Sequence, residues 1–155
     1  MSTRRAFICG LSGLTLTEAE AAFLARWRPA GIILFSRNVG SPDQVRDLIS
    51  EARRALGCRG DSLVLVDQEG GRVQRLAEPY WRRFPPAAAF GRYYGRDAAR
   101  ALECAALCAA AMAKDLYALG FNMTCAPVLD LPVSGADRVI GDRAYASDPE
   151  TAVAL

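Results

Sequence analysis

The stretch LVLVDQEGGRVQRL, from Leu63 to Leu76, changes from apolar to charged halfway along its length. The first four residues, LVLV, are continuously apolar and predict a strand that is buried on both faces. Asp67 and Glu69 follow at once, two glycines come next, and Arg72 and Arg75 close the stretch. A buried strand that ends in paired carboxylates and guanidiniums predicts polar chemistry at the strand's carboxyl end.

Three other apolar runs predict strands of the same kind: AFICG at residues 6–10, GIILF at 31–35 and FNMTCAPV at 121–128. Like LVLV, these runs do not alternate with polar residues, which is typical of strands in a parallel sheet covered by helices. The segment after LVLV, through Pro79 to Pro86, is interpreted as a proline-bearing connection. Strand and helix alternate four times, so we expect a single α/β domain.

The helices are predicted from the residues at their ends. Thr17 and Glu20 have the spacing of a capping box, and Ser41 precedes a proline at a first helical position. A long alanine-rich helix is expected over about residues 97–119, with a glycine directly after it as its stop. A last helix start is expected at residues 147–150.

Composition argues against two classes of partner. The 155 residues carry a net charge of only +2, which gives no general attraction to nucleic acid or to a membrane surface. Arg92, Arg96 and Arg100 recur at helical spacing among acidic residues, which is typical of a solvated helix face. The apolar run AFICGL is too short for a membrane span and is broken by glycine, unlike a signal peptide. We therefore expect a cytoplasmic protein that binds neither nucleic acid nor membrane.

The cysteines and the missing histidine bear on metal binding. The sequence has five cysteines without a CxxC pair, and they are expected to act as small buried apolar residues in a reducing compartment: Cys9, Cys58, Cys104, Cys108 and Cys125. No histidine is present to join them, so a zinc site is not expected.

Polar side chains follow three of the predicted strands, where a parallel α/β fold gathers its ligand-binding groups. They are Ser36, Arg37 and Asn38; then Asp67, Glu69, Arg72 and Arg75; then Asp130, Asp137, Asp142 and Arg143. Carboxylates accept from hydroxyl groups and arginines donate to carbonyl or sugar oxygens, so this set suits a ligand rich in hydroxyl and amide groups.

A purely structural role is open for the same residues. Asp67 would then cap the next turn, and Arg75 would pair with Glu69 or Glu78. Paired glycines at 70–71 favour a ligand, because they let a backbone approach it closely.

The motifs resemble one known family. VDQEGGRVQRL resembles the signature of bacterial β-N-acetylhexosaminidases of glycoside hydrolase family three, and further matching motifs follow in order: GLSG, GIILFSRN, APVLDL and RVIGDRAYASDPE. The resemblance implies a TIM-type (β/α)8 barrel. Such a barrel typically needs about 250 residues, so residues 1–155 are expected to be the N-terminal half of a catalytic barrel domain, truncated at Leu155.

The resemblance also implies roles for three residues. Asp67 and Arg75 would hold an N-acetylglucosamine ring in the subsite before the scissile bond, and Arg143 would be a third ligand. The implied substrate is a small saccharide, a muropeptide fragment with terminal β-linked N-acetylglucosamine, and the process is cell-wall recycling. Neither a metal nor an organic cofactor is implied.

The catalytic groups of the family are not expected in this chain. The family uses an aspartate nucleophile with retention, a histidine acid/base on a mobile loop, and a KHFPGHG-type segment, and the sequence contains no histidine. We therefore predict no catalytic residue here and no activity from the chain alone. An open half-barrel would also expose strand edges and is expected to self-associate.

Two alternatives remain. In the first, the chain is a non-catalytic carbohydrate-binding or decayed remnant protein. The reading frame beyond Leu155 distinguishes this alternative from a truncated enzyme: an in-frame continuation with a histidine-bearing loop would favour the enzyme, and a natural stop would favour the binder or remnant. Alternatively, Asp67 with Glu69 or Asp130 forms a glycosidase carboxylate pair; we rank this last because nothing in the sequence shows that they converge.

Overall fold

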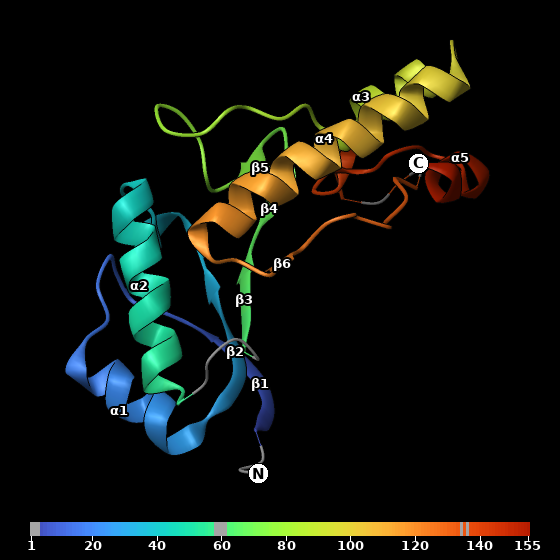
Figure 1. Ribbon diagram of the computed structural model, residues 1–155. Coiled ribbons are helices and arrows are strands. Elements are labelled where there is room, and N and C mark those ends of the chain that lie inside the picture. The colour runs from blue at the N-terminus through green and yellow to red at the C-terminus, as the bar shows by residue number, and fades with distance from the viewer. Residues whose placement is uncertain (1–3, 58–61, 134, 136) are drawn as a thin grey trace. The chain divides into compact units, whose positions relative to one another are not determined.

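The computed structural model describes residues 4–57, 62–133, 135 and 137–155 (Figure 1). The chain divides into two compact units. Unit 1 consists of Met1–Asp67 and Asp115–Thr124, and unit 2 consists of Gln68–Lys114 and Cys125–Leu155.

Unit 1 contains a four-stranded sheet. Its strands are β1 (Arg5–Gly10), β2 (Pro29–Leu34), β3 (Leu63–Val66) and β6 (Met123–Thr124), in the order β1-β2-β3-β6. Every neighbouring pair is parallel, and Gly31–Leu34 of β2 lie opposite Leu63–Val66 of β3. The predicted parallel α/β sheet is therefore confirmed.

The fourth strand is shorter than the sequence predicts. Only Met123 and Thr124 of residues 121–128 pair with β3. Phe121 turns into the core with 2% of its surface exposed, and the Asn122 side chain bonds the β3 backbone, accepting from Val64 N at 2.7 Å. Side-chain hydrogen bonds thus replace part of the ladder, which an apolar pattern does not reveal.

Burial is greatest in the two central strands. Ile32 and Leu34 of β2 and Val64 and Val66 of β3 are fully buried. The edge strand β1 differs, since Ile8 is 41% exposed. The expectation that every strand is buried on both faces is therefore wrong for β1, the strand at one edge of the described sheet.

Two helices of unit 1 begin where their caps predict. α1 (Glu18–Trp27) begins with the capping box, in which the Thr17 hydroxyl accepts from Glu20 N at 3.2 Å. α2 (Pro42–Ala55) follows Ser41, whose hydroxyl accepts from Gln44 N at 3.3 Å. The two helices contact each other and lie against the same side of β1–β3 (Figure 1).

Unit 2 contains two elements that the sequence did not predict. One is a hairpin of β4 (Gln68–Gly70) and β5 (Val73–Gln74), which comes directly after β3. The other is α3 (Ala87–Tyr94), which lies between the expected proline-bearing connection and the expected long helix. Both elements are short: β5 has two residues and α3 has eight. In addition, α3 begins after Pro86 without a side-chain cap, so neither its length nor its first residues mark it as a helix in the sequence.

The remaining elements include the predicted long helix and the last helix. α4 (Ala98–Leu119) spans 22 residues and runs from unit 2 into unit 1. A short 3-10 helix, η2 (Gly141–Arg143), precedes α5 (Pro149–Ala154), whose cap is Asp148. The stripe of Arg92, Arg96 and Arg100 does not form one helix face, because the chain turns between α3 and α4.

The prediction that the cysteines are buried is wrong for those that the structure describes. Cys104 and Cys125 are exposed, and Cys9 and Cys108 are partly exposed; none of these four forms a disulfide. Cys58 lies outside the described residues. Among the described part of the chain, no group of His, Cys, Asp and Glu could hold a metal ion, and no helix found there is long and apolar enough to cross a membrane.

Candidate functional site

The polar residues after β2 have a structural role. Asn38, in the short 3-10 helix η1 (Ser36–Asn38), is fully buried, and its Nδ2 donates to the carbonyl oxygens of Leu11 at 3.1 Å and Gly13 at 2.8 Å. Its Oδ1 accepts from Phe35 N at 2.9 Å. All the hydrogen bonds of this side chain are directed at backbone, so the expectation that Asn38 serves a ligand is wrong.

The β4–β5 hairpin after β3 is organised by a buried glutamine. Gln68 is 2% exposed, and its Oε1 accepts from the backbone N–H of Arg75 and of Leu76, both at 3.0 Å. Its Nε2 donates to Leu76 O at 3.0 Å. One side chain thus fixes the backbone that carries Arg75, a predicted sugar ligand.

The paired glycines serve the packing of this hairpin. Gly70 and Gly71 have φ values of 93° and 59°, in a region where only glycine is free of strain. A side chain at Gly70 would clash with the Pro85 carbonyl, and one at Gly71 would place its Cβ 2.7 Å from Pro86 Cβ. The glycines therefore let the hairpin approach its own chain, and nothing in their packing requires a ligand.

A bidentate ion pair within unit 2 joins Glu69 to Arg143. Arg143 Nε donates to Glu69 Oε2 at 2.7 Å, and Nη2 donates to Oε1 at 2.8 Å. The side chain of Glu69 is only 7% exposed and that of Arg143 is 22% exposed. Such a bidentate pair is stronger and more directional than a single charged hydrogen bond. Sequence reasoning named both residues but did not pair them.

A second contact joins the same two segments. Arg72 Nε donates to Asp142 Oδ1 at 2.9 Å, and Arg72 Nη2 donates to the carbonyl oxygens of Val139 and, at 3.2 Å, Ile140. The residues on both sides of the glycine pair are therefore tied to η2 and the residues before it. This pair is nearly half exposed, so its ionic part is expected to be weaker than that of Glu69–Arg143.

The three predicted sugar ligands are distributed over both units. Asp67 ends unit 1, directly after β3, and Arg75 and Arg143 belong to unit 2. β4 holds the backbone of Arg75 through Gln68 and the guanidinium of Arg143 through Glu69. That the three side chains share one pocket stays a prediction. The Asp67–Glu69 version of the carboxylate pair needs Glu69 to face a sugar, whereas both of its oxygens accept from Arg143. The Asp67–Asp130 version stays a prediction.

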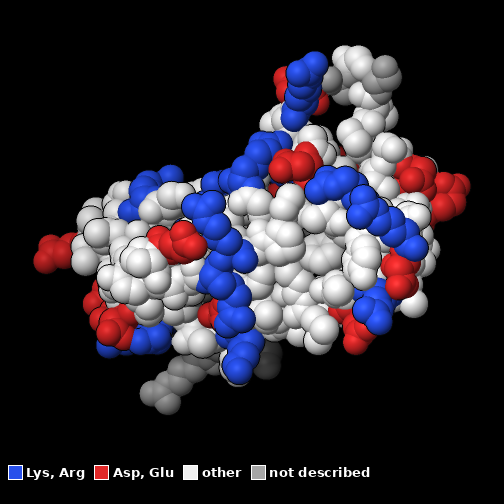
Figure 2. Space-filling view, turned by 90° about the horizontal axis from the view of Figure 1, so that it is seen from above, with Lys and Arg blue, Asp and Glu red and all other residues white. Residues whose placement is uncertain are grey.

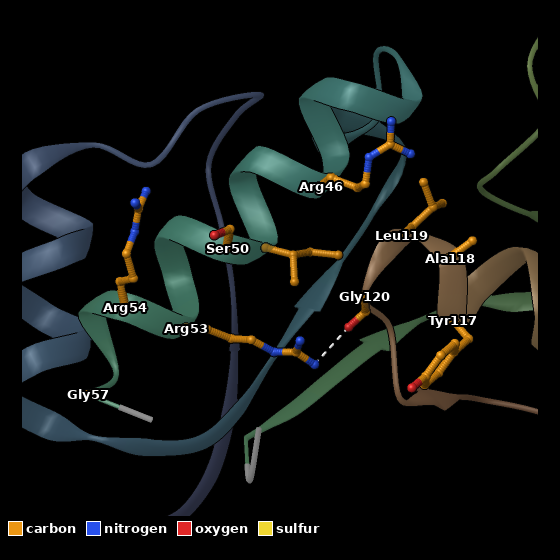
Figure 3. A pocket seen from close by; sticks show the side chains of 10 residues that line it. Arg46, Ser50, Arg53, Arg54, Gly57, Tyr117, Ala118, Leu119 and Gly120 are labelled. Atoms are coloured by element: carbon orange, nitrogen blue, oxygen red, sulfur yellow. Dashed lines mark hydrogen bonds between the residues drawn. The ribbon is translucent and has the colours of Figure 1, made fainter. Parts of the chain in front are cut away.

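A hollow within unit 1 is lined by several arginines. It has a volume of about 790 Å³ and lies between α2 and the turn after α4 (Figure 3). Its arginines have local partners: Arg46 pairs with Asp43, Arg54 approaches Glu51 at 3.9 Å, and Arg53 donates to Gly120 O at 2.8 Å. Arg53 thereby binds a carbonyl at a helix C-terminus, a normal structural role for arginine.

A smaller hollow of about 380 Å³ lies within unit 2, lined by residues of α3 and of the segment around Tyr145. Burial, and to a lesser extent Cys108, raises the pKa of Tyr145. Phe90 stacks on Tyr145 with ring centroids 6.4 Å apart, which gives this tyrosine a packing role. Figure 2 shows that the basic side chains on one face are interspersed with acidic ones. The hollows and this surface therefore add no further candidate site.

Comparisons with known proteins agree with the motifs around the hairpin. Residues 9–155 match the family model described as Glycosyl hydrolase family 3 N terminal domain. A Beta-hexosaminidase from Methylococcus capsulatus is 45% identical over 144 residues, and one from Thioalkalivibrio sulfidiphilus is 44% identical over 145. These matches cover 93% and 94% of this chain but 41% of each relative, so the chain spans about two fifths of their length.

Solved structures similar to this chain include a NagZ and a further glycoside hydrolase of family 3. NagZ from Neisseria gonorrhoeae, crystallised with N-trifluoroacetyl-D-glucosamine, has a TM-score of 0.89 and 32% identity; the likeness covers 97% of this chain and 44% of that one. A glycoside hydrolase family 3 β-N-acetylglucosaminidase from Paenibacillus has a TM-score of 0.83 and 31% identity, covering 96% of this chain and 27% of that one.

Proposed function

Because the chain belongs to glycosyl hydrolase family 3, we propose that it is the N-terminal part of a β-N-acetylhexosaminidase that cleaves terminal β-linked N-acetylglucosamine from muropeptides. The predicted fold is confirmed: the chain is α/β, of the TIM-barrel type, and covers less than half of its solved structural neighbour NagZ. The observation that carries the proposal is that β4 fixes the backbone of Arg75 through Gln68 and the guanidinium of Arg143 through Glu69.

We assign sugar binding to Asp67, Arg75 and Arg143. The Asp67 carboxylate accepts from sugar hydroxyls, and the two guanidiniums donate to sugar oxygens or to the acetamido carbonyl. Support comes from the motif VDQEGGRVQRL, which places Asp67 and Arg75 on either side of the hairpin, and from the fixed guanidinium of Arg143.

The chemical step needs groups that this chain does not contain. A retaining glycosidase uses one residue as nucleophile and another to protonate the leaving group, and the acid of this family is a histidine by resemblance. The sequence has no histidine. We therefore propose that the chain contributes sugar-binding residues and that hydrolysis requires the remainder of the catalytic domain.

Binding and turnover measured on the same protein test this proposal. We expect saturable binding of N-acetylglucosamine by calorimetry and no hydrolysis of a chromogenic N-acetylglucosaminide. Asp67→Asn is expected to weaken binding at least about tenfold, because a charged hydrogen bond is lost. Asp47→Asn, which removes an exposed carboxylate on α2, is the matched control. Turnover by the purified chain, or equal binding by both variants, would contradict the proposal.

A carbohydrate-binding protein without catalysis is the second candidate, and the lack of histidine favours it. Both candidates predict the same sugar affinity. They differ when the chain is combined with the C-terminal part of a catalytically competent relative: restored hydrolysis supports the enzyme, and binding without hydrolysis supports the second candidate.

We also propose a cytoplasmic location and a role in cell-wall recycling, in line with the muropeptide substrate.

A further proposal concerns self-association of the chain. β1 and β6 are the outer strands of the described sheet, and Ile8 and Met123 on them are 41% and 46% exposed. Exposed apolar side chains on strands at the edge of a sheet favour self-association.

A further inference from the structure

Glu69 is a nearly buried carboxylate whose two oxygens both accept from one guanidinium. Arg143 lies 74 residues away in the sequence and donates through Nε and Nη2 at 2.7 and 2.8 Å. Two parallel hydrogen bonds fix the plane of a guanidinium as well as its position. Rotation of the Arg143 head group would break both bonds, so Glu69 determines the direction in which its remaining N–H groups point.

The same contact changes the charge that Arg143 presents. A carboxylate at bonding distance, with a side chain only 7% exposed, offsets the positive charge of its partner more fully than a solvated pair does. A guanidinium compensated in this way donates hydrogen bonds to neutral oxygens but has little net attraction for an anion. An uncompensated arginine would favour phosphate or carboxylate groups.

We propose that Glu69 is a positioning residue that also sets the specificity of the sugar site: it orients Arg143 and restricts the site to neutral aminosugars over anionic ones. The inference rests on the proposed function and goes beyond it by assigning a role to a residue that is not itself a sugar ligand. Arg72 and Asp142 assist by tying the η2 segment to the hairpin.

The positioning role is testable without sugar. In a ¹H–¹⁵N spectrum of the wild-type chain we expect the Arg143 Nε–H signal, assigned through its scalar connectivity to the Arg143 backbone, to be shifted downfield and slow to exchange. Glu69→Gln is expected to move it to the range of exposed arginines. A wild-type signal already in that range would overturn the inference, whether or not any variant folds, and would leave the proposed function intact.

The specificity role needs two probes, N-acetylglucosamine and N-acetylglucosamine 6-phosphate. Glu69→Gln is expected to shift the affinity ratio toward the phosphate by about tenfold or more, because one compensating charge is removed close to the site. Glu69→Asp keeps the charge but shortens the side chain, so both affinities should fall about tenfold with their ratio unchanged. A merely structural role would lower both affinities in both variants.

The control is Glu78→Gln, which removes a carboxylate that is 66% exposed and lies 3.5 Å from Arg83. It should change neither affinity. If the wild-type chain binds N-acetylglucosamine and the probe ratio is the same in Glu69→Gln, the specificity inference is overturned and the proposed function stands. If the wild-type chain binds neither probe, the proposed function fails and the inference with it.

Discussion

Asn38 and Glu69 illustrate how a polar residue near a strand end can act on the protein itself. Asn38 bonds backbone atoms of Leu11 and Gly13, more than 20 residues earlier in the chain. Glu69 bonds a side chain much later in the chain. The sequence places both near strand ends, where ligand-binding residues gather. Only their partners show that each side chain bonds the protein's own chain.

The first prediction concerns Asn38→Ala. The change removes three hydrogen bonds. It leaves the Gly13 carbonyl and the Phe35 N–H without their Asn38 partner, while Leu11 O keeps its bond from Arg37 Nε, so the free energy of unfolding should fall by about 2–4 kcal/mol. Urea unfolding followed by circular dichroism measures it. Ser36→Ala, at an exposed position in the same turn, should change it by less than about 0.5 kcal/mol. Equal effects of the two changes would refute the role given to Asn38.

At the scale of elements, α1 is determined by local chemistry. Glu20 accepts from Thr17 N at 2.9 Å and from Ser12 N at 2.7 Å, while the Thr17 hydroxyl caps the helix. Burial raises the pKa of Glu20, but the hydrogen bonds from Thr17 and Ser12 outweigh it and lower the pKa below its ordinary value. The ionised carboxylate is therefore the form that stabilises this helix start.

The second prediction follows from the sign of that shift. A carboxylate with a lowered pKa in the folded state contributes stability above its unfolded pKa, and the contribution is lost as pH falls through the folded value. Wild type should exceed Glu20→Gln in free energy of unfolding at pH 7, and the difference should shrink below about pH 4.5. Urea unfolding at pH 7 and pH 3 measures this. A difference that grows on acidification would contradict it.

A companion variant shows whether the cap is formed at all. Thr17→Ala removes the hydroxyl that accepts from Glu20 N and should lower the free energy of unfolding by about 1 kcal/mol at pH 7. Because that hydroxyl does not titrate, part of this loss should persist at pH 3.

At the scale of the whole molecule, the exposed strands of the sheet concern assembly. The described sheet has β1 and β6 as its outer strands, and the apolar side chains of Ile8 and Met123 on them are exposed. This exposure supports the proposal that the chain associates through its sheet edges.

The third prediction tests that proposal through Ile8→Glu. A charge on the exposed apolar side chain of β1 should weaken self-association and shift the midpoint of dimer formation to at least about tenfold higher concentration. Light scattering behind size-exclusion chromatography measures the mass at several concentrations. Val153→Glu, at a position in α5 that is 86% exposed, is the control and should leave the mass unchanged. A wild-type chain that is monomeric throughout would end the proposal.

Much of the fold could be predicted because its signals are local. The strand Leu63–Val66 and the starts of α1 and α2 were all predicted from neighbouring residues, and each is confirmed. The β4–β5 hairpin, α3 and the early end of β6 were not. These elements are short and owe their form to contacts such as Gln68 with Leu76 and Asn122 with Val64, which no local pattern contains.

The amino-acid sequence by itself determined the α/β alternation, the family motifs and the residue types available to a sugar, because helix caps, apolar strands and motif spacing depend on neighbours along the chain. Only the tertiary structure decided which charges meet. Glu69 bonds Arg143 although 74 positions separate them, and Gln68 rather than a ligand holds the backbone of Arg75. An ion pair forms where the folded backbone brings two side chains within bonding distance, and that distance is a property of the fold.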